Sequence, residues 1–293
     1  MESKEAEPSS LSTRWWSKDT IVVVTGANQG IGYALVKRFA ELGLTVVLTA
    51  RDPSKGLRAV ASLRAEGLHV GFCRLDVADP ASIKAFAASM REAYGAVDIL
   101  VNNAAVSFNE LDQNSVEHAE TVMKTNFYGA KLLTEALLPL FRRSASISRM
   151  LNISSRLGLL NKVTNESVRR LLLDEERLSE EKIDGMVNLF LEDVQSGKWQ
   201  ERGWPKVWTD YAVSKLALNA YSRLLAKQLQ GRRISVNCFC PGFTKTAMTG
   251  GQGKYTADAV AALAARVALL PPDELPTGKF FSGANSSSFY SKL

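Results

Sequence analysis

The chain has 293 residues, 46% of them hydrophobic, and a formal net charge of +6. This length and hydrophobic content suit one large core and exclude a chain that is disordered throughout. The sequence has no Lys/Arg run of five or more, no zinc-finger spacing and no RNP-type aromatic strip, which argues against a nucleic-acid-binding protein.

The chain begins with a polar segment. Residues 1–19 mix acidic and basic side chains and contain no apolar run of the length found in signal peptides. No later stretch approaches roughly eighteen consecutive apolar residues, so we expect no membrane span. We therefore expect a cytoplasmic protein whose residues 1–19 form a flexible tail.

From residue 20 onward, short apolar runs alternate with stretches in which apolar residues recur at helical spacing. The predicted strands cover residues 21–24, 44–49, 69–77, 98–104, 149–155 and 234–242. The predicted helices cover residues 33–42, 54–66, 80–94, 116–143, with a possible bend near Pro139, and 211–230. Such alternation predicts the α/β class, with a doubly wound parallel sheet of Rossmann type that forms one domain over residues 20–293.

Residues 161–206 break this alternation. Between residues 166 and 202 we count ten acidic against six basic side chains, so the segment is acidic within a basic chain. It contains two helical patterns, and Ser179 is a plausible N-cap of the second. The apolar face of that second pattern consists of Met186, Val187, Phe190, Leu191 and Val194. We expect a helical insertion packed on the main sheet, because the segment is too short for a core of its own.

The cysteines and histidines do not indicate a disulfide framework or a metal site. The three cysteines are an odd number without framework spacing. Cys238 and Cys240 alternate within a predicted strand, so we expect them to share one face as small buried hydrophobic residues. His69 and His118, the two histidines, are far apart in the sequence, and no metal is expected.

Three glycines lie between the first predicted strand and the helix that follows it. Gly26, Gly30 and Gly32 permit positive φ and a close approach of the backbone to a ligand. The N-terminus of the helix offers free N–H groups and partial positive charge, which suit a pyrophosphate. Taken alone, the cluster is also compatible with an ordinary glycine-rich turn.

The second predicted strand ends in a basic residue. Arg51 can form paired hydrogen bonds with a phosphate, and Lys55 follows four residues later. Dinucleotide cofactors with a plain ribose favour an acidic residue at this strand end, whereas Asp52 comes one residue after the arginine. The pattern favours NADP(H) over NAD(H), although both cations are also compatible with a solvated loop.

Tyr211 and Lys215 are four residues apart on a predicted helix, so their side chains face the same side. A nearby ammonium stabilises a phenolate, and we therefore expect Lys215 to lower the pKa of Tyr211. Such a phenol can exchange a proton with a substrate. On their own, the two residues would form an ordinary amphipathic surface pair.

Ordered motifs over residues 21–248 resemble the short-chain dehydrogenase/reductase family. In chain order these are TGANQGIG at 25–32, LDV at 75–77, NNAA at 102–105, KTNFYGA at 124–130, NISS at 152–155, YAVSK at 211–215 and PGFTKT at 241–246. Ala105 departs from the pattern, because the family usually has glycine there. The change is one methyl group, and we expect cofactor binding to survive it.

The resemblance implies the following roles. The catalytic residues are Asn126, Ser155, Tyr211 and Lys215, with Ser154 turned away from the site. The substrate-binding residues are Ser155, Trp208 and Tyr211. The cofactor NADP(H) is bound by Gly26, Asn28, Gln29, Gly30, Ile31, Gly32, Arg51, Lys55, Asp76, Val77, Asn103, Ala104, Tyr211, Lys215, Pro241, Gly242, Phe243, Thr244 and Thr246.

The implied activity is NADPH-dependent reduction of a ketone or aldehyde, or the reverse oxidation of an alcohol. Reduction of a conjugated C=C bond and a non-catalytic NADP-binding regulatory role are the alternatives. Tyr211 favours carbonyl chemistry, because some relatives that reduce C=C bonds have replaced the tyrosine.

The long insertion resembles plant reductases of terpenoids and alkaloids and monomeric animal carbonyl reductases. It therefore implies a monomer and a bulky apolar substrate. Trp204, Pro205, Val207 and Trp208 precede the tyrosine, and they either line an apolar pocket or attach the insertion to the core.

Overall fold

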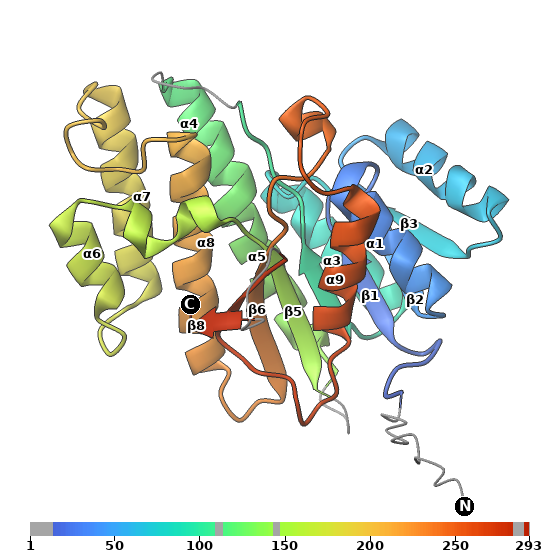
Figure 1. Ribbon diagram of the computed structural model, residues 1–293. Helices are drawn as coiled ribbons and strands as arrows, with labels where there is room; N and C mark the ends of the chain where they lie inside the picture. The colour runs from blue at the N-terminus through green and yellow to red at the C-terminus, as the bar shows by residue number, and fades with distance from the viewer. Residues whose placement is uncertain (1–13, 109–113, 143–146, 284–289, 293) are drawn as a thin grey trace, which may run out of the picture.

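A single sheet of eight strands forms the centre of the fold (Figure 1). The computed structural model describes residues 14–108, 114–142, 147–283 and 290–292. The strand order is β3-β2-β1-β4-β5-β6-β7-β8, with seven parallel strands and an antiparallel β8 at the edge. The strands are β1 (Ile21–Val24), β2 (Thr45–Ala50), β3 (Val70–Arg74), β4 (Ile99–Asn102), β5 (Ser148–Ile153), β6 (Ile234–Cys240), β7 (Lys279–Ser282) and β8 (Tyr290–Lys292). The predicted doubly wound sheet is confirmed.

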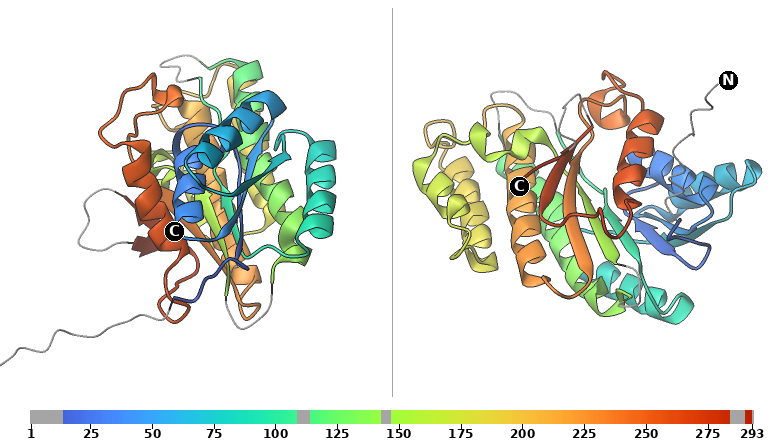
Figure 2. Two further views of the ribbon diagram at one scale, coloured as in Figure 1. Left: turned by 90° about the vertical axis from the view of Figure 1, so that its right-hand side faces the viewer. Right: turned by 60° about the horizontal axis from the view of Figure 1, so that its bottom comes forward.

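The central strands are buried along their whole length because helices cover both faces of the sheet. One face packs against α1 (Gly30–Glu41), α2 (Pro53–Ala65) and α9 (Ala257–Ala268). The other packs against α3 (Pro80–Ala93), α5 (Gly129–Leu137) and α8 (Thr209–Gln228). Figure 2 shows the two helical layers on either side of the strands. The sheet therefore separates two apolar cores.

The predicted helix over 116–143 is one helical run with two changes of winding. α4 (Val116–Met123) continues through a π-helical turn (Lys124–Tyr128) into α5, and a 3-10 turn (Leu138–Leu140) follows. Pro139 lies in that 3-10 turn, which agrees with the predicted bend. The π turn is not evident from the sequence, and π turns are often found at functional sites.

The insertion folds as two helices packed outside α8 (Figure 1). They are α6 (Glu166–Leu173) and α7 (Glu180–Gln195), and α7 contacts both α8 and α4. Ser179 caps α7 as predicted, because its hydroxyl accepts a hydrogen bond from the N–H of Lys182 at 3.4 Å. Four residues of the predicted apolar face are buried, and Leu191 packs against them while partly exposed.

Residues 14–19 differ from the expected flexible tail. The indole N–H of Trp15 donates to the carbonyl of Leu269 at 3.1 Å, and the Arg149 guanidinium lies 3.4 Å from the centroid of the Trp15 ring. Trp16 packs against the core that contains α1. Residues 1–13 lie outside the described residues.

Among the described residues, the helix α9 and the strands β7 and β8 lie beyond the sequence predictions. Helix α9 buries Val260, Ala261 and Ala264, so a helical apolar pattern was present in the sequence. Cys238 and Cys240 are buried as expected and unpaired. Within the described residues, no helix is long and apolar enough to cross a membrane.

Candidate active site

A cavity of about 1030 Å³ opens where β1, β4, β5 and β6 end. Ligands of doubly wound sheets bind at this carboxyl edge. All the residues predicted to bind cofactor or substrate line the cavity except Gly32, which packs against the lining residues Gly26 and Asn103. Of the four predicted catalytic residues, Ser155, Tyr211 and Lys215 line the cavity and Asn126 does not.

The glycine turn after β1 has the geometry of an anion site. Gly26 and Gly30 both have φ of +60°, which favours glycine. A Cβ on Gly32 would lie 2.5 Å from the Nδ2 of Asn103. Helix α1 begins at Gly30, and no side chain caps it at Gln29. Its first N–H groups therefore remain available to a phosphate at the rim of the cavity.

The β4 loop is attached directly to this turn. The Asn103 side chain donates to the carbonyl of Thr25 at 2.8 Å, and the Thr25 hydroxyl accepts from the N–H groups of Asn103 and Ala104, each at 2.9 Å. Asn103 is therefore used to hold the turn in place. Ala105 lines the cavity.

Arg51 and Lys55 lie at the far end of the cavity, and both side chains are exposed. The Asp52 carboxylate caps α2 by accepting from the N–H of Lys55 at 3.1 Å, and this hydrogen bond lowers the pKa of Asp52. The acidic residue is thus engaged by its own helix, while the two cations face the cavity. This end suits a phosphate better than a plain ribose.

The loop after β3 supplies Asp76 and Val77 to the cavity wall. The Asp76 carboxylate accepts from the N–H of Ala78 at 3.0 Å, which fixes the turn. A Cβ on Gly129 would lie 2.6 Å from the carbonyl oxygen of Val77, so this loop packs directly against α5.

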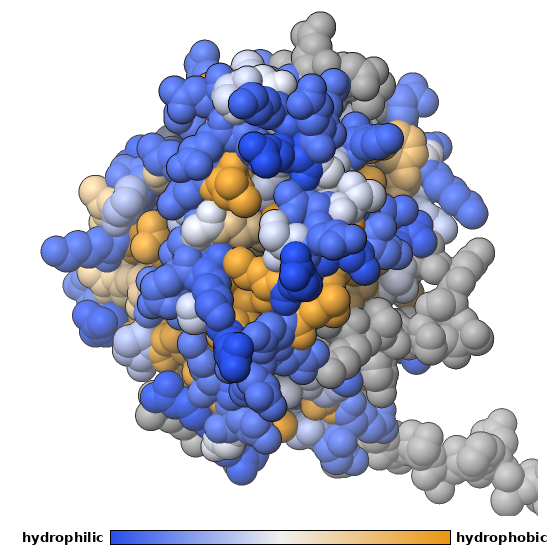
Figure 3. Space-filling view, turned by 90° about the vertical axis from the view of Figure 1, so that its left-hand side faces the viewer, coloured by the Kyte–Doolittle hydropathy of each residue, from blue (hydrophilic) through white to orange (hydrophobic). Residues whose placement is uncertain are grey.

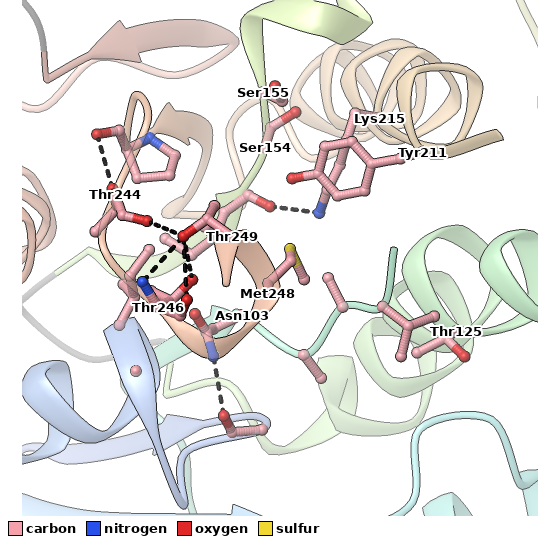
Figure 4. A pocket seen from close by; sticks show the side chains of 18 of the residues that line it. Asn103, Thr125, Ser154, Ser155, Tyr211, Lys215, Thr244, Thr246, Met248 and Thr249 are labelled. Carbon is pink, nitrogen blue, oxygen red and sulfur yellow. Dashed lines mark hydrogen bonds between the residues drawn. The ribbon is translucent and has the colours of Figure 1, made fainter. Parts of the chain in front are cut away.

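Tyr211 and Lys215 project from the first turns of α8 into the cavity (Figure 4). The Lys215 Nζ lies 5.5 Å from the centroid of the Tyr211 ring and donates to the carbonyl of Ile153 at 2.8 Å. Lys215 is 1% exposed. Burial lowers the pKa of Lys215 to about 8, because the desolvated ammonium is less stable.

The expectation that Lys215 lowers the pKa of Tyr211 is wrong. Burial raises the pKa of the Tyr211 phenol above its ordinary value of about 10. Desolvation of the phenolate outweighs the attraction of an ammonium that is directed at a backbone carbonyl. The phenol is therefore protonated at neutral pH, which is the form that donates a proton.

The two adjacent serines after β5 lie in different surroundings. Ser154 is fully buried, and its hydroxyl donates to the Asn219 side chain at 2.6 Å. Ser155 is partly exposed to the cavity, and its hydroxyl accepts from the N–H of Leu157 at 3.1 Å. Ser155 retains its proton for a further hydrogen bond.

Asn126 lies in the π-helical turn and connects the β4 loop to α8. Its side chain accepts from the N–H of Val106 at 2.8 Å and donates to the Val106 carbonyl at 2.9 Å. It also donates at 3.0 Å to the hydroxyl of Ser214, which in turn donates to the carbonyl of Tyr211 at 2.7 Å. Asn126 is 1% exposed and lies beside the cavity, outside its lining.

The loop after β6 closes the cavity above α1. Thr246 caps a 3-10 turn (Ala247–Thr249), and the Thr249 hydroxyl donates to the carbonyl of Thr244 at 2.8 Å (Figure 4). A Cβ on Gly30 would lie 3.5 Å from the Thr246 methyl group. Pro241, Gly242 and Phe243 line the same wall, and half of the Phe243 side chain is exposed.

The tryptophans before α8 have separate surroundings. Trp208 lines the cavity and meets the Tyr211 ring edge-on, with centroids 6.4 Å apart. Its backbone is left-handed (φ 47°), which is strained for a bulky residue. Val207 also lines the cavity. Trp204 instead packs against Phe190 in α7, with 3% of its surface exposed. Val207 and Trp208 therefore line the cavity, whereas Trp204 packs the insertion into the apolar core.

Several lining residues were absent from the sequence predictions. They include Arg156, Leu157 and Leu159 from the turns after β5, Asn161 and Lys162 from the start of the insertion, and Met248 from the β6 loop. The position of the insertion directly after NISS was the available signal. Within the described ranges, no three His, Cys, Asp or Glu residues are grouped to hold a metal ion.

The chain is similar to known reductases and dehydrogenases over most of its length. The family described as short chain dehydrogenase matches residues 20–168, and the family described as enoyl-(acyl carrier protein) reductase matches residues 196–274. The (+)-neomenthol dehydrogenase of Arabidopsis thaliana is 40% identical over 291 residues, covering 91% of this chain and 97% of the relative. Human carbonyl reductase (NADPH) 1 is 37% identical over 269 residues, covering 89% of this chain and 95% of the relative. The structure of salutaridine reductase from Papaver somniferum superimposes with a TM-score of 0.84 at 36% identity, covering 90% of this chain and 100% of that one.

Proposed function

The chain belongs to the short-chain dehydrogenase/reductase family of oxidoreductases, and from this we propose that it is an NADPH-dependent reductase of ketones or aldehydes. The observation that carries the proposal is the placement of Tyr211, Lys215 and Ser155 at one end of a cavity whose other end holds a glycine turn and two cations. A single cavity thus has room for a dinucleotide and for the group that it reduces.

The residues present fit NADP(H). The uncapped N-terminus of α1 and the Gly26–Gly30 turn suit the pyrophosphate, and Arg51 with Lys55 suits the additional phosphate on the ribose. Ala105 is one methyl group larger than the usual family glycine and lines the cavity without closing it. When bound, the reduced nicotinamide supplies a hydride.

We assign the proton transfer to Tyr211. Its phenol is protonated at neutral pH and projects into the cavity beside Ser155. Tyr211 donates its proton to the carbonyl oxygen of the substrate, and the Ser155 hydroxyl hydrogen-bonds the developing alkoxide. Lys215 supplies a cation behind the phenol, and Asn126 holds the first turn of α8 through Ser214.

We propose a bulky apolar substrate of the specialised-metabolite type, a terpenoid or an alkaloid. Val207, Trp208, Leu157 and Met248 give the substrate end of the cavity an apolar lining. Several relatives carry names of this class, among them salutaridine reductase and (+)-neomenthol dehydrogenase.

We further propose that the protein is a cytoplasmic monomer. Free Cys73, Cys238 and Cys240 suit a reducing compartment. The insertion covers the outer side of α8, and the molecular face on that side is mostly hydrophilic, with separate apolar patches (Figure 3).

The test is a Tyr211→Phe variant assayed with NADPH and a panel of cyclic ketones. We expect turnover, followed by nicotinamide absorbance, to fall by about 100-fold or more, because the proton donor is lost. NADPH binding, followed by nicotinamide fluorescence, should remain, and Tyr94→Phe is the matched control outside the cavity. Full turnover by Tyr211→Phe would overturn the assignment of the proton donor. A folded wild-type protein that binds NADPH and reduces no carbonyl compound would overturn the proposed function.

A further inference from the structure

The substrate end of the cavity carries a charge pattern that the proposed activity does not explain. Besides Lys215, two cationic side chains line this end, Arg156 and Lys162. The acidic residues that line the cavity, Asp52 and Asp76, both lie at the cofactor end, on the loops after β2 and β3. Among the described residues, no carboxylate lines the substrate end.

Both cations come from the turns between β5 and α6. Arg156 begins the 3-10 turn Arg156–Gly158, and Lys162 ends the 3-10 turn Leu160–Lys162. The first turn is fixed to β6, because the backbone N–H of Arg156 donates to the Sγ of Cys240 at 3.3 Å. The backbone of Arg156 is therefore held in place, and both bases line the cavity close in sequence to Ser155.

Neither cation is neutralised by the chain. Within the part of the chain that the structure describes, the side chains of Arg156 and Lys162 form no hydrogen bond or ion pair, and both residues are exposed. This contrasts with Lys131, which is held between Glu180 and Asp184 at 3.0 and 3.1 Å. The two bases at the cavity are thus free to interact with a ligand.

We infer that the substrate is a bulky ketone that carries a carboxylate distant from its carbonyl group, and that ketones bearing an ammonium group are disfavoured. The Arg156 guanidinium matches a carboxylate with two parallel hydrogen bonds, and Lys162 adds a second positive charge. A protonated amine at the substrate end would lie near three cations, Arg156, Lys162 and Lys215, and near no carboxylate among the described lining residues. The inference rests on the proposed function and narrows its substrate class, because alkaloid amines are cationic at neutral pH.

Three matched ketones test the inference. They are cyclohexanones of equal length that carry a distal carboxylate, a neutral methylamide or a distal ammonium, each assayed with NADPH. At low ionic strength we expect kcat/KM to rank carboxylate above amide above ammonium. We expect about tenfold between the extremes, since an exposed ion pair contributes up to about 1 kcal/mol, or about fivefold. The difference should lie in KM, because the charges are distant from the reacting carbon.

Variants and changes in ionic strength distinguish recognition of the substrate charge by Arg156 and Lys162 from a purely structural role of these residues. Arg156→Gln and Lys162→Gln should each reduce the carboxylate-to-ammonium ratio by about threefold, and the double variant should bring it close to one. Lys84→Gln, an exposed residue on α3 outside the cavity, removes the same net charge and should keep the ratio. Raising the ionic strength from about 0.01 M to about 1 M should also reduce the ratio.

Each other outcome has a distinct meaning. Equal kcat/KM for the three ketones, or a preference for the ammonium, would overturn the inference and leave the proposed function in place. If Arg156→Gln loses NADPH affinity but keeps the carboxylate-to-ammonium ratio, Arg156 binds the cofactor and not the substrate. That result would also overturn the inference. No turnover of any of the three ketones by a protein that binds NADPH would count against the proposed function itself.

Discussion

Burial of the Lys215 side chain has a large effect on the pKa of its ammonium group. The fold places this ammonium in a buried position where its pKa falls to about 8, whereas an unfolded lysine titrates near 10.4. Between these two values the unfolded chain binds more protons than the folded one. The free energy of unfolding should therefore increase as the pH rises from about 8 to about 10, and below pH 8 the contribution of Lys215 should be constant.

A Lys215→Met variant isolates this contribution. The wild type should gain about 2 kcal/mol in free energy of unfolding relative to the variant between pH 8 and 10. Urea unfolding followed by tryptophan fluorescence at a series of pH values measures the two slopes. Identical slopes would show that Lys215 titrates normally in the folded protein.

Arg51 determines the choice of cofactor if the proposed binding mode is correct. Arg51→Gln removes the guanidinium at the phosphate end of the cavity, and we expect the NADPH-over-NADH ratio of kcat/KM to fall by about tenfold or more. The same assay on Lys84→Gln gives the effect of one lost charge elsewhere. An unchanged ratio in Arg51→Gln would mean that Arg51 is an ordinary solvated side chain.

The site residues that belong to local motifs could be predicted from the sequence. Effects of burial, and residues that reach the cavity from separate loops, could not. Tyr211 and Lys215 share a helix face, so their spacing alone places them together. The direction of the Tyr211 pKa depends on desolvation, which sequence spacing does not encode. Lys162 and Met248 reach the cavity only because separate loops fold over it.

At the scale of elements, the turn after β5 is attached to α8 at two points. The Asn219 side chain accepts from Ser154 and donates to the carbonyl of Gly158 at 2.9 Å. Gly158 also lies so close to α8 that an added Cβ would be 2.4 Å from the backbone carbon of Lys215. The turn that carries Ser155 is therefore fixed relative to Tyr211 and Lys215.

Gly158→Ala should separate this turn from α8. We expect a loss of about 1–3 kcal/mol in stability from overpacking, together with a fall in kcat, because Ser155 moves relative to Tyr211. Gly185→Ala in the exposed middle of α7 is the matched control, since its Cβ would meet no atom within 4 Å. The control should gain about 0.5–1 kcal/mol from helix propensity. Thermal unfolding and steady-state kinetics of both variants provide the comparison, and normal kcat in Gly158→Ala would show that the contact does not position Ser155.

The alternation of elements was predictable up to β6, because buried parallel strands and amphipathic helices have distinct periods. The π-helical turn was not, since it depends on the bonds between Asn126, Val106 and Ser214, which are distant in sequence. β7 has four residues and β8 three, too short for a periodic signal.

At the scale of the whole molecule, the insertion contains an aromatic contact that ties its last residues to α7. Trp204 packs on Phe190, and its indole N–H donates to Asp193 at 2.8 Å. We expect Trp204→Ala to lower the free energy of unfolding by about 3–5 kcal/mol. If the insertion keeps the protein monomeric, this variant should also associate at raised concentration in sedimentation velocity, whereas the wild type should sediment as one monomer.

Leu189→Ala on the exposed side of α7 is the matched control, because 38% of that leucine is exposed. It should change stability by no more than about 0.5 kcal/mol and remain monomeric. A wild type that sediments as a dimer would contradict the monomer proposal directly.

The contact between Trp15 and Leu269 has a consequence for biosynthesis. The two residues are 254 positions apart, and Arg149, which lies against the Trp15 ring, also donates to the carbonyl of Leu270 at 3.1 Å. A nascent chain contains these carbonyls only after strands β1 to β6 have been synthesised. Trp15 and Arg149 therefore lack these partners while six strands of the sheet are already synthesised, and we expect closure of this corner to come late in folding.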